Sequence, residues 1–125
     1  MKIMIKIPML PPRELNPNAR VHWSEKARCT NEFRAYTKFY ALEQTRFARP
    51  CLEKASVKVT LVIPRNRRKR DIDNLIASLK PAIDGCIDAG IIRDDNPDCL
   101  TWDSDIEYEV DKARAPLTVL EFKEP

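Results

Sequence analysis

The sequence is poor in the residues on which several common functional motifs depend. It has only 2 glycines against 10 prolines, which disfavours a glycine-rich phosphate loop and a dinucleotide-binding fingerprint. Its single histidine, His22, comes without a Gly-x-Ser-x-Gly elbow, which disfavours serine–histidine–acid catalysis. No apolar run is long enough to cross a bilayer, and the first residues lack the apolar stretch and cleavage site of a signal peptide. We therefore expect a cytoplasmic protein with no membrane association and no organic cofactor.

The 4 cysteines also exclude some chemistry. None is part of a Cys-x-x-Cys pair, and a structural zinc site needs four closely spaced Cys or His ligands. Disulfides are rare in a reducing cytosol. We therefore expect the cysteines to act as small and mostly buried apolar residues; they are Cys29, Cys51, Cys86 and Cys99.

Length and charge suggest one compact domain with two oppositely charged segments. The chain has 125 residues, which fits a single domain over 1–125, and its net charge is only +3. Basic residues crowd the segment 65–70, whereas 94–111 is rich in Asp and Glu. Such neighbouring clusters suit either self-association or a site that attracts phosphate and holds a cation.

Hydrophobic periodicity predicts the element order β-α-β-α-β-β. Alternation indicates strands over 3–7, 57–63, 106–110 and 117–122, and helical spacing indicates helices from Ser24 to near Pro50 and from Asp71 to near Gly90. We expect the last two strands to form a hairpin. The fold class expected is α/β (α+β), with a small mixed β-sheet of about four strands and two main helices.

Three local features refine this prediction. Ser24 is a good N-cap for the first helix. An aromatic stripe along that helix, which includes Tyr36 and Phe47, predicts a face buried in the core. Pro81 interrupts the second helical pattern, so we expect it to kink the helix or split it in two.

Four aspartates bracket the second predicted helix. Asp71 and Asp73 flank its start, and Asp94 and Asp95 lie in the loop by which the chain returns to the sheet. A strand–helix–return unit can bring these carboxylates together, where their mutual repulsion calls for a cation. Magnesium prefers such hard oxygen ligands, together with water and phosphate. The sequence therefore predicts a magnesium site.

The basic segment beside these aspartates suits a phosphodiester substrate. A magnesium ion can generate hydroxide and neutralise the scissile phosphate, while arginines and lysines hold the nucleic-acid backbone. The expected DNA-binding residues in this segment are Arg67, Arg68, Lys69 and Arg70. Taken singly, each feature has a simpler explanation, because Asp71 could be a helix cap and the basic run a solvated loop.

Two hexapeptides in this region are similar to a known family. Arg70-Asp71-Ile72-Asp73-Asn74-Leu75, followed by Gly90-Ile91-Ile92-Arg93-Asp94-Asp95, resembles the RusA-type Holliday junction resolvases. Leu10-Pro11-Pro12 and the loop that follows resemble the same family.

The resemblance implies a RusA-like homodimer that cuts four-way DNA junctions by paired symmetric cuts in recombination and repair. It implies that Asp71, Asp73 and Asp95 bind Mg²⁺, for which Mn²⁺ can substitute. Asp94 would assist these ligands, and Asn74 would orient a ligand or a water. A two-fold dimer supplies two identical sites for the two cuts.

One position departs from the family pattern. The family often has a lysine where this chain has Ala77, whereas Lys80 follows one turn later on the same helix stripe as Asp73 and Asp84. We expect Lys80 to take the place of the missing lysine and to contact DNA. Arg20 and His22, in the loop after the first strand, are further candidate DNA contacts.

Three alternatives remain open. Pro97-Asp98 with Glu121-Phe122-Lys123 has the form of a PD…ExK nuclease motif, which would move the metal site. A non-catalytic dimer could bind nucleic acid through the basic loop 65–70. A structural protein could use its opposite charges for assembly, in which case high salt would dissociate it.

Overall fold

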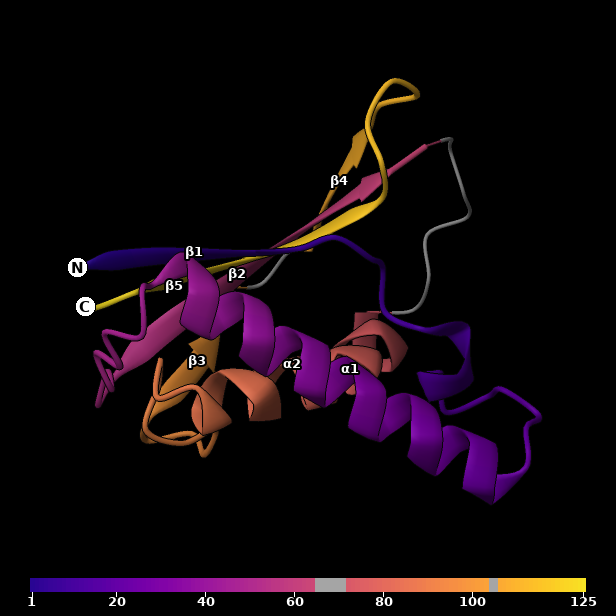
Figure 1. Cartoon of the computed structure of the whole chain (residues 1–125), viewed down its shortest axis with the longest axis horizontal. Coiled ribbons are helices and arrows are strands. Elements are labelled where there is room, and N and C mark those ends of the chain that lie inside the picture. The colour runs from indigo at the N-terminus through magenta and orange to yellow at the C-terminus, as the bar shows by residue number, and fades with distance from the viewer. Residues whose placement is uncertain (65–71, 104–105) are drawn as a thin grey trace.

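The computed structural model is a mixed α+β fold, as the sequence predicts (Figure 1). The structure describes residues 1–64, 72–103 and 106–125, with 72–75 described by their backbone alone. The elements are β1 (Lys2–Ile7), a 3₁₀ turn (Arg13–Leu15), α1 (Trp23–Gln44), β2 (Ala55–Ile63), α2 (Ile72–Asp88), β3 (Leu100–Trp102), β4 (Glu107–Val110) and β5 (Leu117–Lys123).

In the described part of the chain, five strands form one sheet around β2. The order is β1-β5-β2-β3, with β1 antiparallel to β5 and β5 antiparallel to β2. β3 and β4 both lie parallel to β2 on its other edge, β3 beside Ala55–Val57 and β4 beside Thr60–Ile63. The helix α2 supplies the crossover that parallel pairing requires.

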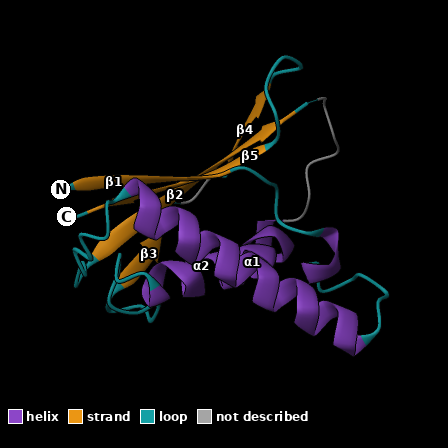
Figure 2. Cartoon of the chain, in the orientation of Figure 1, coloured by secondary structure: helices purple, strands orange, loops and turns teal. Residues whose placement is uncertain are grey.

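Both long helices lie on one face of this sheet, with α1 beside α2 (Figures 1 and 2). Their axes approach closely at Gly85, where an added Cβ would lie 2.5 Å from the backbone oxygen of Arg34. The guanidinium of Arg34 also donates two hydrogen bonds to the carboxylate of Asp88, at 2.6 and 2.9 Å. The position of α2 against α1 is thus fixed by both shape and charge.

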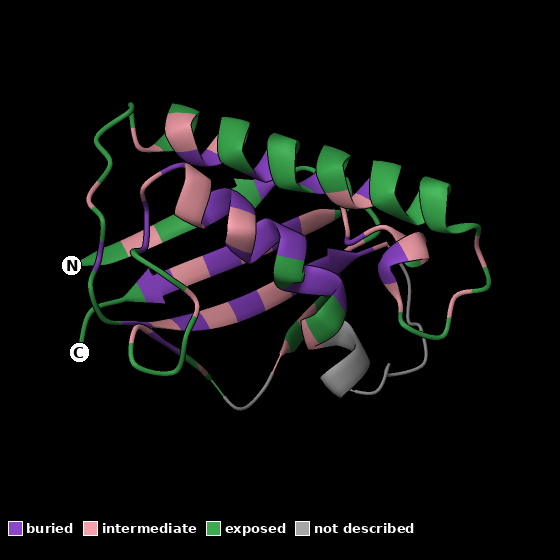
Figure 3. Cartoon of the chain, turned by 90° about the horizontal axis from the view of Figure 1, so that it is seen from below, coloured by how far each residue is buried: buried purple, intermediate pink, exposed green. Residues whose placement is uncertain are grey.

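The core fills the space between the helices and the sheet. Figure 3 shows buried residues along the sides of the helices and strands that face one another. Phe33 of α1, Leu79 and Ile83 of α2, and Leu120 and Phe122 of β5 are essentially inaccessible to solvent. Their burial places α2, and therefore the residues on it, at a defined height over the sheet.

The predicted hairpin of the last two strands is wrong. β4 pairs with β2, and β5 pairs with β1 and with the opposite edge of β2. The central strand β2 thus lies between the two strands that were expected to pair. The structure also has a strand, β3, in the acid-rich segment 94–111, where the only strand predicted was 106–110.

Three expectations for the helices also need correction. Tyr36 is 49% exposed, because only a narrow stripe of α1 faces α2 and the sheet, and Phe47 is 69% exposed in the turn that follows α1, which ends at Gln44 and not near Pro50. His22 rather than Ser24 is the N-cap of α1, and its ring nitrogen accepts from the backbone N–H of Ser24. Helix α2 runs through Pro81 as one segment, so of the two predicted effects of Pro81 the split is wrong.

The cysteines are buried only in part. Cys29 and Cys86 are buried, Cys99 is half-buried and Cys51 is exposed. Burial raises the pKa of the Cys86 thiol strongly, so this side chain behaves as an apolar core residue. None of the helices in the described residues is both long and apolar enough to span a membrane.

Candidate active site

The loop after α2 brings Asp95 back to the middle of that helix. The ammonium of Lys80 lies 2.9 Å from Oδ2 of Asp95 and 3.7 Å from Oδ1 of Asp84, one turn along the helix. The sequence predicts that Asp95 meets the aspartates that flank the start of the helix; its contact with Lys80, in the middle of the helix, was not predicted. Asp84 lies next to the same pair, as its position one turn from Lys80 on the same helix stripe predicts.

Asp94 has a different position from its neighbour. Its carboxylate accepts from the backbone N–H of Asp95 at 2.7 Å and from the side-chain amide of Asn96 at 2.9 Å. Asn96 in turn accepts from the backbone N–H groups of Asp98 and Cys99. Asp94 thus holds the turn that presents Asp95, while Asp95 is the carboxylate directed at the helix.

The contact between Lys80 and Asp95 favours the charged form of both groups. The hydrogen bond from Lys80 lowers the pKa of the Asp95 carboxyl, and the same bond raises the pKa of the Lys80 ammonium. The Asp95 side chain is 31% exposed and that of Lys80 is 64% exposed. Asp95 is therefore an ionised oxygen donor in contact with solvent.

The structure describes the other predicted metal ligands and DNA contacts only in part or not at all. Asp73 and Asn74 lie in the first turn of α2, and their side chains are outside the description. Asp73 precedes Lys80 by about two helical turns, roughly 10 Å along the axis, and so lies on the same face of α2. Asp71 and the predicted DNA contacts Arg67, Arg68, Lys69 and Arg70 lie outside the described residues.

The described side chains do not include the full predicted metal site. Among the side chains that the structure describes, no three or more His, Cys, Asp or Glu residues are grouped as a metal site. The predicted set would combine Asp95 with Asp71 and Asp73, all of which offer hard carboxylate oxygens, the ligand type that Mg²⁺ prefers.

A hollow of about 150 Å³ adjoins the Lys80–Asp95 pair. Its lining also includes Ile76, Ala77 and Ile83 of α2, and Trp102 of β3. The sequence prediction missed Trp102, because a strand of three residues has too little alternation to be recognised. Trp102 reaches this place because β3 pairs in parallel with the start of β2.

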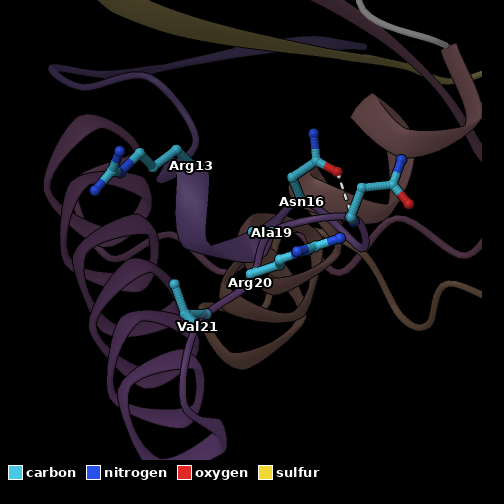
Figure 4. Close-up of a pocket in the computed structure, with 6 residues that line it drawn as sticks. Arg13, Asn16, Ala19, Arg20 and Val21 are labelled. Atoms are coloured by element: carbon cyan, nitrogen blue, oxygen red, sulfur yellow. Dashed lines mark hydrogen bonds between the residues drawn. The ribbon is translucent and has the colours of Figure 1, made fainter.

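Arg20 lies in a separate hollow of about 300 Å³, formed by the loop between the 3₁₀ turn and α1. Asn16 tightens this loop, since its side chain accepts from the backbone N–H of Asn18 at 2.9 Å. Figure 4 shows Arg20 extending toward the side of Asn16, whereas Arg13 extends the opposite way. Arg20 is exposed, while His22 is occupied as the N-cap of α1.

The residues of the alternative PD…ExK pattern are only partly together. Asp98 and Lys123 line one hollow of about 200 Å³. Glu121 does not line it and instead forms an ion pair with Lys2 of the neighbouring strand. The structure therefore gives less support to a site built from the PD…ExK residues than to a site at the Lys80–Asp95 pair.

Two known proteins are similar to this chain over about two thirds of its length. No family model matches the chain. It is 37% identical over 86 residues to the crossover junction endodeoxyribonuclease RusA of Aquifex aeolicus, a match that covers 69% of this chain and 52% of that protein. It is 31% identical over 81 residues to an uncharacterised protein of Xylella fastidiosa, covering 63% of this chain and 52% of that protein. The chain thus spans about half the length of the curated relatives that it matches.

Proposed function

We propose that this chain is a RusA-like, magnesium-dependent endodeoxyribonuclease that resolves four-way DNA junctions in recombination and repair. The observation that carries the proposal is the meeting of Asp95 with Lys80 on the face of α2 that also bears Asp73. The likeness to RusA of Aquifex aeolicus supports the same reaction. The enzyme would act in the cytoplasm of a bacterium or of a phage-infected cell.

Carboxylates from the two ends of the helical unit would share the metal. Asp71, Asp73 and Asp95 would be ligands, with Asp94 fixing the turn that presents Asp95. Asn74 would orient a ligand or a water. Magnesium, or manganese in its place, would supply a hydroxide nucleophile and neutralise charge on the scissile phosphate.

Lys80 has two roles in this scheme. Its hydrogen bond keeps Asp95 in the ionised form that metal binding requires. Its exposed ammonium can also contact a DNA phosphate on the same face of the helix. Lys80 would thus compensate for the lysine that is missing at Ala77.

DNA binding would extend beyond the cleavage site. Arg67, Arg68, Lys69 and Arg70 would hold phosphates close to it, and Arg20 would add a contact from the loop before α1. Each phosphate contact increases the salt dependence of binding. A homodimer would place two such sites around one junction, as two symmetric cuts require.

The test compares the wild type with Asp95→Asn and Asp73→Asn on a labelled junction. We expect both variants to fold and to bind the junction, and to have lost magnesium-dependent cleavage. Cleavage by both variants at the wild-type rate would refute the assigned site. Binding without cleavage by the wild type, in magnesium and in manganese, would instead support a non-catalytic DNA-binding dimer.

A further inference from the structure

The hollow that Lys80 and Asp95 line also has apolar walls, which have no role in the metal chemistry proposed above. It lies between α2 and β3, and its volume is about 150 Å³. Trp102 is half-buried there: it packs partly against the hydrophobic core and also lines the hollow. An indole at the wall of a small hollow, next to a candidate catalytic carboxylate, requires an explanation beyond core packing.

The lining suits a flat ring better than it suits a phosphate. Ile76, Ala77, Ile83 and Trp102 supply apolar walls, and the charged groups are confined to Lys80 and Asp95. A phosphate inside the hollow would find one cationic donor, Lys80, among the lining residues, and its other oxygens would lie against these apolar walls, which is costly. The volume is close to that of a protein cavity known to hold benzene, about 150 Å³, so one six-membered ring would fit.

We propose that this hollow receives one unstacked nucleobase of the DNA strand that is cleaved at Asp95. The inference rests on the proposed function, and it assigns Trp102 as the residue on which the base stacks. Bases at a branch point lose part of their stacking, so removing one from the helix costs less there than within a duplex. Aromatic side chains bind such bases by stacking on their faces.

This assignment makes a positional prediction. If one base enters the hollow, the enzyme depends on the base at one defined position near the cut and not on its neighbours. Loss of that base should slow cleavage by about tenfold, the order of effect that a lost base–aromatic stack produces. A residue that merely completes the core would show no dependence on any single base.

The experiment uses a set of four-way junctions in which each nucleotide near the cut is replaced, one at a time, by an abasic analogue. Cleavage rates in magnesium are compared for the wild type, Trp102→Ala and Trp102→Phe. We expect the wild type to be slowed at one position. Trp102→Ala should be slower on the intact junction and equally fast at every abasic position, whereas Trp102→Phe should keep the wild-type profile.

Two further variants separate stacking from folding. Ala77→Leu fills the hollow from an exposed helix position without altering the core, so it should abolish the positional dependence while leaving the thermal unfolding temperature unchanged. Trp23→Ala is the matched control, because Trp23 is the other tryptophan and is 76% exposed at the start of α1. Trp23→Ala should keep the wild-type profile.

A flat profile for the wild type on junctions that it cleaves would overturn this inference and leave the proposed function intact. The inference would also be overturned, with the proposed function intact, if Ala77→Leu and Trp102→Ala kept the positional dependence of the wild type. If the wild type binds junctions without cutting them, its affinity is measured on the same abasic series in place of its cleavage rate. The inference then requires that loss of the base at one position weakens binding. Failure to bind or cleave any branched DNA would refute both proposals.

Discussion

Replacement of Asp95 by asparagine removes a carboxylate charge with little change in the shape of the side chain. In the structure this carboxylate accepts a hydrogen bond of 2.9 Å from Lys80. Both partners contact solvent, with exposed side-chain fractions of 64% for Lys80 and 31% for Asp95. An ion pair this accessible contributes less than about 1 kcal/mol to the free energy of unfolding, so Asp95→Asn should lower the unfolding temperature by no more than roughly 3–6 °C.

The expected effect on cleavage is much larger. If Asp95 is a metal ligand, its loss should reduce magnesium-dependent cleavage by at least about 100-fold, which corresponds to about 2.7 kcal/mol of lost transition-state stabilisation. The unfolding temperature and the cleavage rate are measured on the same preparation, by thermal unfolding and by single-turnover cleavage of a junction. The loss of activity should therefore exceed the loss of stability by a wide margin.

Asp84→Asn provides the matched control. Oδ1 of Asp84 also lies near the Lys80 ammonium, at 3.7 Å, but Asp84 is a residue of α2 and is not one of the predicted metal ligands. If Asp95 acted only by holding Lys80, the two variants would reduce cleavage to a similar extent. Equal effects of the two substitutions, or an Asp95→Asn variant that cuts at the wild-type rate, would refute the assignment of Asp95 as a ligand.

Three further predictions concern other parts of the fold. Gly85→Ala should destabilise the protein by about 2 kcal/mol in urea unfolding, because its Cβ would lie 2.5 Å from the Arg34 backbone oxygen; unchanged stability would contradict the close helix packing. The hydrogen bonds from Arg34 lower the pKa of Asp88, so the pair stabilises the fold above about pH 4 and loses this effect as the pH falls through the lower native pKa. At pH 7 Asp88→Asn should therefore be less stable than the wild type by about 1 kcal/mol, a value that allows for the solvent exposure of the pair. Near pH 2 the two proteins should be equally stable. A difference in stability that persists at pH 2 would show that the Arg34–Asp88 pair is not its cause. Glu121→Gln should leave junction cleavage unchanged, and a large loss would favour the PD…ExK pattern instead.

The helices and the long strands could be predicted because their signals are local. Alternation along Ala55–Leu61 of β2 and helical spacing along α2 reflect a buried face in each case, and these faces contribute to the core. The number and partners of the short strands could not be predicted in the same way. β4 lies next to β5 in sequence, yet β2 separates them in the sheet, because pairing depends on the crossover through α2.

The exposed aromatics show a second limit of periodicity. Tyr36 follows Phe33 at a helical spacing, but only Phe33 is buried, because the contact of α1 with its neighbours is narrower than the apolar stripe. For the candidate site, the sequence predicted that Asp95 returns toward the aspartates at the start of α2, but it did not predict the contact of Asp95 with Lys80 in the middle of the helix. Trp102 could not be predicted as a neighbour, because its position depends on strand pairing between distant segments.

The central claim is that this chain cuts branched DNA with the aspartates around α2. The most direct measurement incubates wild type and Asp73→Asn with a labelled four-way junction and with a linear duplex of the same sequence, each with and without magnesium. The account predicts paired symmetric nicks in the junction, produced only by the wild type and only with the metal. Equal cutting of the duplex, cutting without a divalent cation, or cutting by Asp73→Asn at the wild-type rate would contradict it.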